Sequence, residues 1–262
     1  MCIMENDKQE KKDRLIRICK SLYVYRDICN VYIIKREHKA VLIDFGSGGV
    51  MEVLEELQIS RVEAVLVTHH HRDQVEGLCG YNLPVYAPHM ERRLLDEIEI
   101  FWQSREIYNN YNNRQDRFSS CYDIPVTGTL KDYHRYSFMG YEFEIIPTPG
   151  HTVGSVSIGV EMEGRHILFS GDLVYQSGRV WSLAATQWSY NGGEGIAYSI
   201  LSMLEVQRRK FDLLLPSHGN GMFPEEALPE TIENLARLRE TRHQNPRLFL
   251  LRDTPFERIT EH

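Results

Sequence analysis

The stretch RVEAVLVTHHHRDQ, residues 61–74, decides how the rest of the chain is interpreted. Its apolar first half predicts a buried strand, which places the polar second half on a loop at the strand's carboxyl end. Two histidines separated by one residue, His69 and His71, can turn toward one metal ion, whereas His70 between them would point elsewhere. Asp73 can reach a neighbouring position, and imidazole and carboxylate both suit metals such as Zn²⁺.

Three later pieces of the chain have the same form, a metal-capable side chain directly after a β-rich run. They are His151 in PGHT after YEFEIIPT, Asp172 in SGD after HILF, and His218 in SHG after FDLLLP. A glycine beside each of these residues lets the backbone turn tightly. Four such pieces predict one metal site built from loops at strand ends. A chance collection of polar loop residues is the alternative.

The spacing of apolar residues predicts the remaining elements. Strand-like runs fill much of the first half, and helical spacing appears at Val50 to Leu57 and again from Glu91 to Tyr108. Later strands alternate with helices, which favours two sheets between helices over an alternating parallel fold. We expect a single domain, 1–262, with a helical insertion at about 90–118 and a C-terminal helix at about 224–244. The other predicted strands and helices are 23–25, 30–35, 40–45, 141–147, 155–160, 166–170, 193–210 and 211–215.

These motifs resemble the metallo-β-lactamase superfamily. Its signature H-x-H-x-D-H matches His69, His71 and Asp73, but Gln74 stands where the final histidine is expected. The later ligands of the family match His151, Asp172 and His218, in order. The resemblance runs from about residue 23 to about residue 221 and implies an α+β fold, the four-layer αββα sandwich, with the metal site at the edge between the sheets. The glyoxalase II-like and lactonase-like branches are the nearest guides.

The resemblance also implies a role for each residue of the site. His69, His71 and His151 would hold one metal ion, Asp73 and His218 a second, and Asp172 would bridge the two. A hydroxide shared by the ions would be the nucleophile, and with a single ion Asp73 would be the catalytic base.

Gln74 is the one departure from the signature, and it bears on the number of ions. An amide is a weaker donor than imidazole, so Gln74 would be at best a weak ligand and the second ion would be weakened or absent. One or two Zn²⁺ ions are expected, with Fe²⁺ or Mn²⁺ as alternatives.

Composition excludes some classes of protein. The net charge of −7 disfavours a nucleic-acid binder, since such proteins carry a basic surface. Five scattered cysteines without a C-x-x-C pair are typical of free thiols. We expect a cytoplasmic protein without membrane attachment, since the N-terminus lacks the apolar core of a signal peptide and no run approaches the ~18 apolar residues of a membrane span.

The sequence thus predicts a metallo-hydrolase acting on a small ester, thioester or lactone-like substrate. Three alternatives stay open: a mononuclear iron enzyme like the persulfide dioxygenases, a phosphodiesterase or ribonuclease Z-like nuclease, and a non-catalytic metal-binding module. No serine-hydrolase elbow, P-loop or dinucleotide fingerprint is present in the sequence.

Several further residues have a functional and a plain interpretation. Trp181, Trp188 and Tyr190 would line a substrate pocket or merely pack a long loop. Asp44, after an apolar run, would orient a metal-binding histidine or form a simple turn. The segment 91–118 would be a lid, the face of a homodimer or a core-packing helix. The tail 248–262 would cover the domain or lead into a partner segment.

Overall fold

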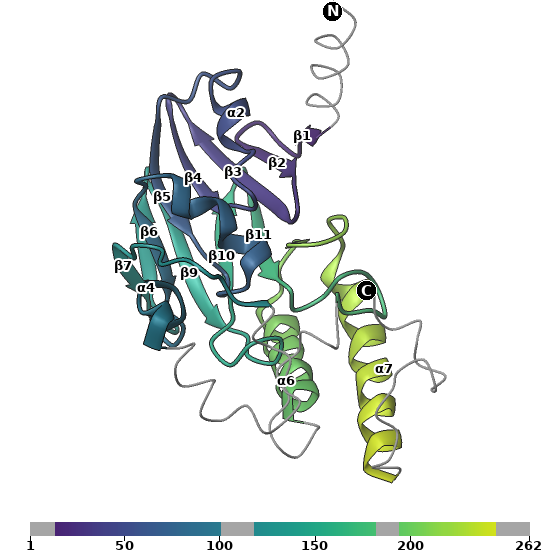
Figure 1. Cartoon of the computed structure of the whole chain (residues 1–262). Helices are drawn as coiled ribbons and strands as arrows, with labels where there is room; N and C mark the ends of the chain where they lie inside the picture. The colour runs from purple at the N-terminus through teal and green to yellow at the C-terminus, as the bar shows by residue number, and fades with distance from the viewer. Residues whose placement is uncertain (1–13, 101–117, 182–193, 245–262) are drawn as a thin grey trace, which may run out of the picture.

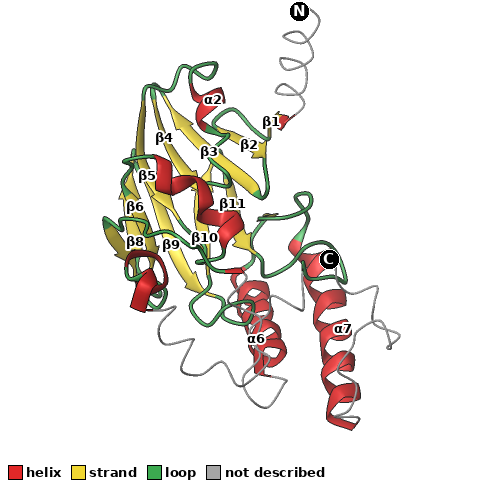
Figure 2. Cartoon of the chain, viewed as in Figure 1, coloured by secondary structure: helices red, strands yellow, loops and turns green. Residues whose placement is uncertain are grey.

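The structure is a computed structural model that describes residues 14–100, 118–181 and 194–244. Figure 1 and Figure 2 show these residues as two β-sheets with helices on their outer sides. No helix in this described part of the chain is long and apolar enough to cross a membrane.

The first sheet has seven strands among the described residues, arranged in the order of the chain. Neighbours from β1 to β4 are antiparallel, and neighbours from β4 to β7 are parallel. The carboxyl ends of β4 to β7 therefore lie along one edge of the sheet. The strands are β1 (Leu15–Arg17), β2 (Leu22–Arg26), β3 (Asn30–Arg36), β4 (Lys39–Ile43), β5 (Arg61–Leu66), β6 (Val85–Pro88) and β7 (Gly128–Leu130).

The second sheet has five described strands, in the order β12-β11-β10-β9-β8. Its neighbours are antiparallel except β11 and β12, which are parallel. The strands β9, β11 and β12 consequently run in one direction, and their carboxyl ends share an edge. The strands are β8 (Arg135–Phe138), β9 (Tyr141–Pro147), β10 (Val156–Met162), β11 (Arg165–Gly171) and β12 (Leu213–Pro216).

Strand β3 shows how the sequence builds two separate cores. Side chains alternate between the faces of a strand, so an unbroken apolar run buries both faces. Val31 and Ile33 pack into the cluster on the outer face of the first sheet. Tyr32 and Ile34 pack into the cluster between the sheets, which also contains Phe143 of the second sheet.

Helices cover the outer face of each sheet. Side chains of α2 (Met51–Leu54), α3 (Arg72–Val75) and the 3₁₀ helix η1 (Glu76–Gly80) pack in the outer cluster of the first sheet, and so does Leu95 of α4 (Arg93–Asp96). The long helices α6 (Glu194–Arg209) and α7 (Pro224–Gln244) cover the second sheet and lie side by side in Figure 1. The predicted four-layer αββα sandwich is therefore confirmed.

The predicted elements agree with the structure where the apolar pattern is long. The bounds of β9 and α7 are as predicted, and α6 differs by one residue at each end. The short strands β1, β6, β7 and β8 were missed, because their three or four residues carry little periodicity and no consecutive apolar run like the three leucines of β12.

One predicted helix is too long, and a second is interrupted. Val50 to Leu57 yields only α2, since the chain turns and Gln58 adopts a left-handed φ of 54°. Glu91 to Tyr108 yields α4, which ends where Glu97 leaves the helical region with φ −133° and ψ 46°. Residues 98–100 are helical again, and 101–117 lie outside the described residues.

Candidate metal centre

The strand-end residues meet at one place because the carboxyl ends of β5, β9, β11 and β12 face each other across the two sheets. The loop 69–74 follows β5, His151 follows β9, Asp172 follows β11 and His218 follows β12. Backbone hydrogen bonds join the sheets here: Asn30 N donates to Ser217 O, and Val156 N donates to Thr68 O. The site thus lies at the edge between the sheets, where loops can present ligands from both.

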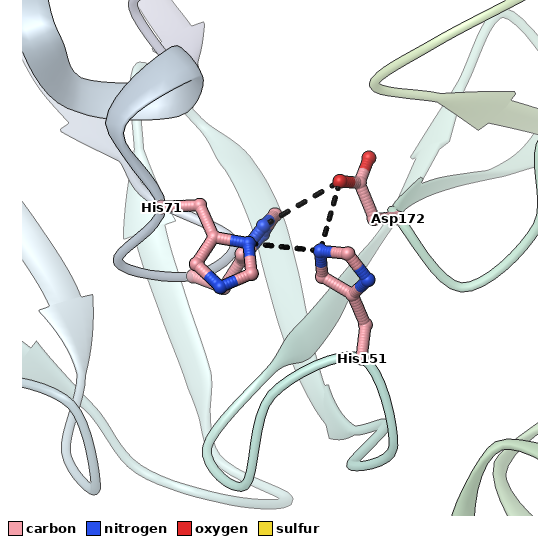
Figure 3. Close-up of side chains that lie close together, drawn as sticks. His71, His151 and Asp172 are labelled. Atoms are coloured by element: carbon pink, nitrogen blue, oxygen red, sulfur yellow. Dashed lines mark hydrogen bonds and ion pairs between the residues drawn. The ribbon is translucent and has the colours of Figure 1, made fainter. Parts of the chain in front are cut away.

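A first group brings together His69, His71, His151 and Asp172, whose potential ligand atoms all lie within 4.8 Å of one another. His71 Nδ1 lies 2.9 Å from His151 Nε2. Asp172 Oδ2 lies 3.1 Å from His151 Nε2 and 3.6 Å from His69 Nε2. Figure 3 shows the labelled rings and the carboxylate turned toward a common point. Donors about 2.1 Å from a tetrahedral ion are about 3.4 Å apart, so this spacing suits one ion.

A second group contains Asp73, Asp172 and His218, also within 4.8 Å of one another. His218 Nε2 lies 2.8 Å from Asp73 Oδ2 and 3.7 Å from Asp172 Oδ1. The two oxygens of the Asp172 carboxylate thus face different groups, Oδ2 the first and Oδ1 the second. A carboxylate in this position can bind one ion through each oxygen.

The protonation of the histidines suits metal binding. Burial lowers the pKa of His69 to about 4 and that of His71 well below its usual value, so both rings are neutral at pH 7. Neutral imidazole is the form that ligates metals. The neighbouring carboxylates act the other way on His218: burial opposes its charge, but Asp172 and then Asp73 raise its pKa.

Buried polar atoms without hydrogen-bond partners point to the same conclusion. Among the described residues, His69 Nε2 and Asp172 Oδ1 are buried and make no hydrogen bond. Leaving such atoms unsatisfied costs free energy, so they need a partner that the polypeptide does not supply. Both atoms face the points where the two groups converge. The site residues therefore fit a divalent metal ion.

Asp44 connects the two sheets beneath the site. Its buried carboxylate accepts hydrogen bonds from Thr68 N at 2.8 Å, from the Thr68 hydroxyl and from the Ser217 hydroxyl at 3.1 Å. The Thr68 oxygen in turn lies 3.0 Å from His69 Nδ1, so the ring can donate there and present Nε2 to the site. The hydrogen bonds therefore favour a role for Asp44 in orienting His69 over that of a simple turn residue. Burial raises the pKa of Asp44 to about 7.

Gln74 lies beside the second group but is held by its neighbour. The residue is 0% exposed, and its amide nitrogen donates to Asp73 Oδ2 at 3.1 Å. Its amide oxygen is buried and accepts no hydrogen bond from the described residues. The amide thus orients the Asp73 carboxylate, and the second group retains three donors without it.

Two aromatic residues border the site. The ring of Trp181 stacks on His218 with centroids 3.9 Å apart and planes at 11°. The ring of Phe118 lies 5.5 Å from that of His71. Trp181 is therefore placed beside the second group, as a pocket residue requires. Trp188, Tyr190 and the tail 248–262 lie outside the described residues.

Sequence reasoning missed Glu91. This carboxylate is 1% exposed and accepts hydrogen bonds from the His70 ring and backbone. His70 is itself buried, so it does not face solvent. Glu91 follows β6, and recognition of VYAP as a strand would have shown it to be one more polar residue just beyond a strand.

The free cysteines are as predicted where the structure describes them. Cys19, Cys29, Cys79 and Cys121 form no disulfide. Burial raises the pKa of the Cys29 thiol well above its usual value, so this thiol is unreactive.

Fold and site together define a member of the metallo-β-lactamase superfamily. Within it, the chain belongs to the family described as "Anti-Pycsar protein Apyc1", which matches residues 23–190.

Curated relatives are distant and carry hydrolase names. A probable metallo-hydrolase of Streptococcus pyogenes is 27% identical over 56% of this chain and 62% of its own length. A hydroxyacylglutathione hydrolase of Tolumonas auensis is 24% identical over 80% of this chain and 70% of its own. In six other hydroxyacylglutathione hydrolases the match spans 44–49% of the relative's length. The chain therefore spans about half the length of most of these relatives.

Solved structures agree on the fold. A metallo-β-lactamase of Cronobacter sakazakii, described by a HARLDQ motif, superposes with a TM-score of 0.65 at 14% identity, covering 90% of this chain and 96% of that one.

Proposed function

We propose that this chain is a hydrolase with two zinc ions that cleaves a small ester or thioester. The observation that carries the proposal is the Asp172 carboxylate, which has His151 on one oxygen and His218 on the other. A site for one ion alone would not need a buried carboxylate open on both sides. Zinc is proposed because the first group offers three imidazoles, the ligands that borderline metals prefer.

His69, His71 and His151 would hold the first ion, Asp73 and His218 the second, and Asp172 both. The bound metal would supply a water of lowered pKa and would polarise the carbonyl of the substrate. Asp73 Oδ2 lies 2.8 Å from His218 Nε2, so in the absence of a second ion these two side chains can hold a proton between them. With one ion bound, Asp73 would be the base that accepts a proton from the attacking water.

The names of the relatives support an acyl substrate. Most of those above are named for hydrolysing hydroxyacylglutathione, in which an acyl group is carried by a thiol. The family description, "Anti-Pycsar protein Apyc1", names something that the protein acts against and does not name a bond that it cleaves. We therefore propose a small acyl thioester or ester as substrate, with Trp181 against His218 as one wall of its pocket.

Phosphodiester hydrolysis is a second candidate, and one observation favours it. The second group keeps three donors although Gln74 replaces a histidine, so a two-metal clamp on a phosphate remains available. In the HARLDQ motif of the Cronobacter protein the first, fifth and sixth letters match His69, Asp73 and Gln74. Glutamine in the sixth place is therefore shared with another protein of this fold.

A substrate panel on the zinc-loaded protein tests the proposal. A 2-hydroxyacyl thioester of glutathione, a p-nitrophenyl ester, a lactone and bis-p-nitrophenyl phosphate would be compared by kcat/KM, with His151→Ala as control. We expect an acyl substrate to exceed the phosphodiester by at least about tenfold, a difference of about 1.4 kcal/mol. A preferred phosphodiester would establish the second candidate. Metal binding without turnover of any substrate would identify a non-catalytic module.

A further inference from the structure

We propose that Glu91 is a positioning residue that ties together two metal-binding loops, the loop 69–71 and the loop 150–155, and so keeps the histidines at the spacing that an ion requires. The inference depends on one part of the proposed function, namely that these loops bind a divalent metal ion.

Each oxygen of the Glu91 carboxylate serves a different loop. Oε2 accepts hydrogen bonds from His70 N at 2.7 Å and from His70 Nδ1 at 3.0 Å. Oε1 accepts from Gly154 N at 3.0 Å and from the hydroxyl of Thr152. His70 lies between two ligands of the first group, and Thr152 is adjacent to the third. One buried side chain thus spans segments more than 60 residues apart in sequence.

The backbone places Glu91 where it can reach both loops. β5 and β6 are parallel neighbours, so the residues that follow them lie side by side at the same edge of the sheet. Glu91 N donates to Pro88 O, the last residue of β6, which begins the turn into α4. From the other side, Gly154 has no room for a side chain, because a Cβ there would collide with Glu91 Cγ. The second loop therefore packs directly on this carboxylate.

The contact also explains the run of three histidines. The His70 side chain is 3% exposed and turned to Glu91, while His69 and His71 are turned to the site. The loop is also held through His71, which forms an isolated β-bridge with Ser119. Although burial opposes its ionisation, the electrostatic interaction with His70 and the hydrogen bonds lower the pKa of Glu91 to about 2, so the carboxylate is ionised at neutral pH.

Cobalt binding tests this role without reference to any reaction. The metal-free wild type, Glu91→Gln and Thr152→Val would be titrated with Co²⁺ against a competing chelator, and the visible absorption of bound cobalt would report its coordination. Loss of a partner that orients metal ligands weakens binding by roughly 10–100-fold, which is the expectation for Glu91→Gln, with an altered spectrum. Thr152→Val, which removes one donor, should show a smaller change in the same direction.

Glu97→Gln is the matched control, because it removes the same charge from the same segment. Glu97 pairs with Arg93 at 3.3 Å and, among the described residues, makes no hydrogen bond or ion pair with either loop, so cobalt should bind as in the wild type. Unchanged cobalt affinity and spectrum in both Glu91→Gln and Thr152→Val would overturn the proposal. If Glu91→Gln does not fold, the cobalt affinity and spectrum of Thr152→Val alone test the proposal. A wild type that binds cobalt but hydrolyses nothing would refute the proposed function and leave this inference standing.

Discussion

At the scale of single residues, the site depends on side chains that face two ways. Asp172 presents one oxygen to each group of donors, and Asp44 receives hydrogen bonds from the loops of both sheets. Gln74 is the residue whose chemistry departs most from the superfamily signature. Its buried amide now orients Asp73 and supplies no imidazole to the second group. We therefore expect residue 74 to influence how tightly a second ion would bind.

Restoring the histidine should strengthen the second site. We expect Gln74→His to raise the affinity for the second zinc ion by at least about tenfold. About tenfold is the lower end of the loss in metal affinity that follows removal of a residue hydrogen-bonded to a metal ligand. Stepwise zinc titration by calorimetry measures both affinities. Gln74→Met, which removes the amide and adds no imidazole, is the control and should weaken the second step. Equal second-step affinities in all three proteins would show that residue 74 has no influence on the site.

At the scale of elements, the sequence predicted most of what brings the ligands together. His69, His71, His151, Asp172 and His218 each follow an apolar run that the sequence pattern identified as a strand, so both the strand and the polar residue after it were visible. The same reasoning failed at Glu91, because β6 has only four residues and no clear period. The ties through Asp44 and Glu91 depend on which strands become neighbours. That information is not contained in local pattern, and the sequence alone left the role of Asp44 open.

The attachment of α6 to the second sheet offers a test at this scale. Arg209 pairs with Glu205 of its own helix at 2.8 Å and with Glu144 of β9 at 2.6 Å, and all three side chains are partly buried. We expect Arg209→Met to lower the free energy of unfolding by on the order of 1 kcal/mol at pH 7. Urea denaturation of the metal-free proteins measures it.

This loss should depend on pH in a defined direction. Hydrogen bonding to Arg209 lowers the pKa of Glu205, so this carboxylate stabilises the fold above its unfolded pKa, and the contribution is lost as pH falls through its folded pKa. The difference between wild type and variant should therefore shrink in acid. Arg237→Met removes an exposed pair on α7 and should change stability little at any pH. A difference for Arg209→Met that grows in acid would contradict this account.

At the scale of the whole molecule, the ligands come from both sheets, so metal binding should couple to global stability. Histidines from the first sheet and carboxylate and imidazole from the second converge on common points. An ion bound there favours the folded state, which alone assembles the donors. The acidic net charge of −7 adds repulsion that a bound cation reduces.

Removal of metal should therefore lower the melting temperature of the whole domain in one cooperative transition. A free ion at about 1,000 times its Kd contributes about 4 kcal/mol. For a domain of this size that corresponds to a fall in Tm on the order of 10 °C. Scanning calorimetry before and after chelation, with zinc added back, measures the shift. A Tm that does not respond to chelation would show that no ion joins the two sheets.

The most direct test of the central claim is elemental analysis of the purified protein, counting and identifying the metal ions in each chain. The two groups that share Asp172 predict close to two zinc ions per chain. About one iron per chain would replace the hydrolase proposal with an oxygen-dependent reaction. No bound metal, even after reloading with zinc, manganese or iron, would contradict the account of the site.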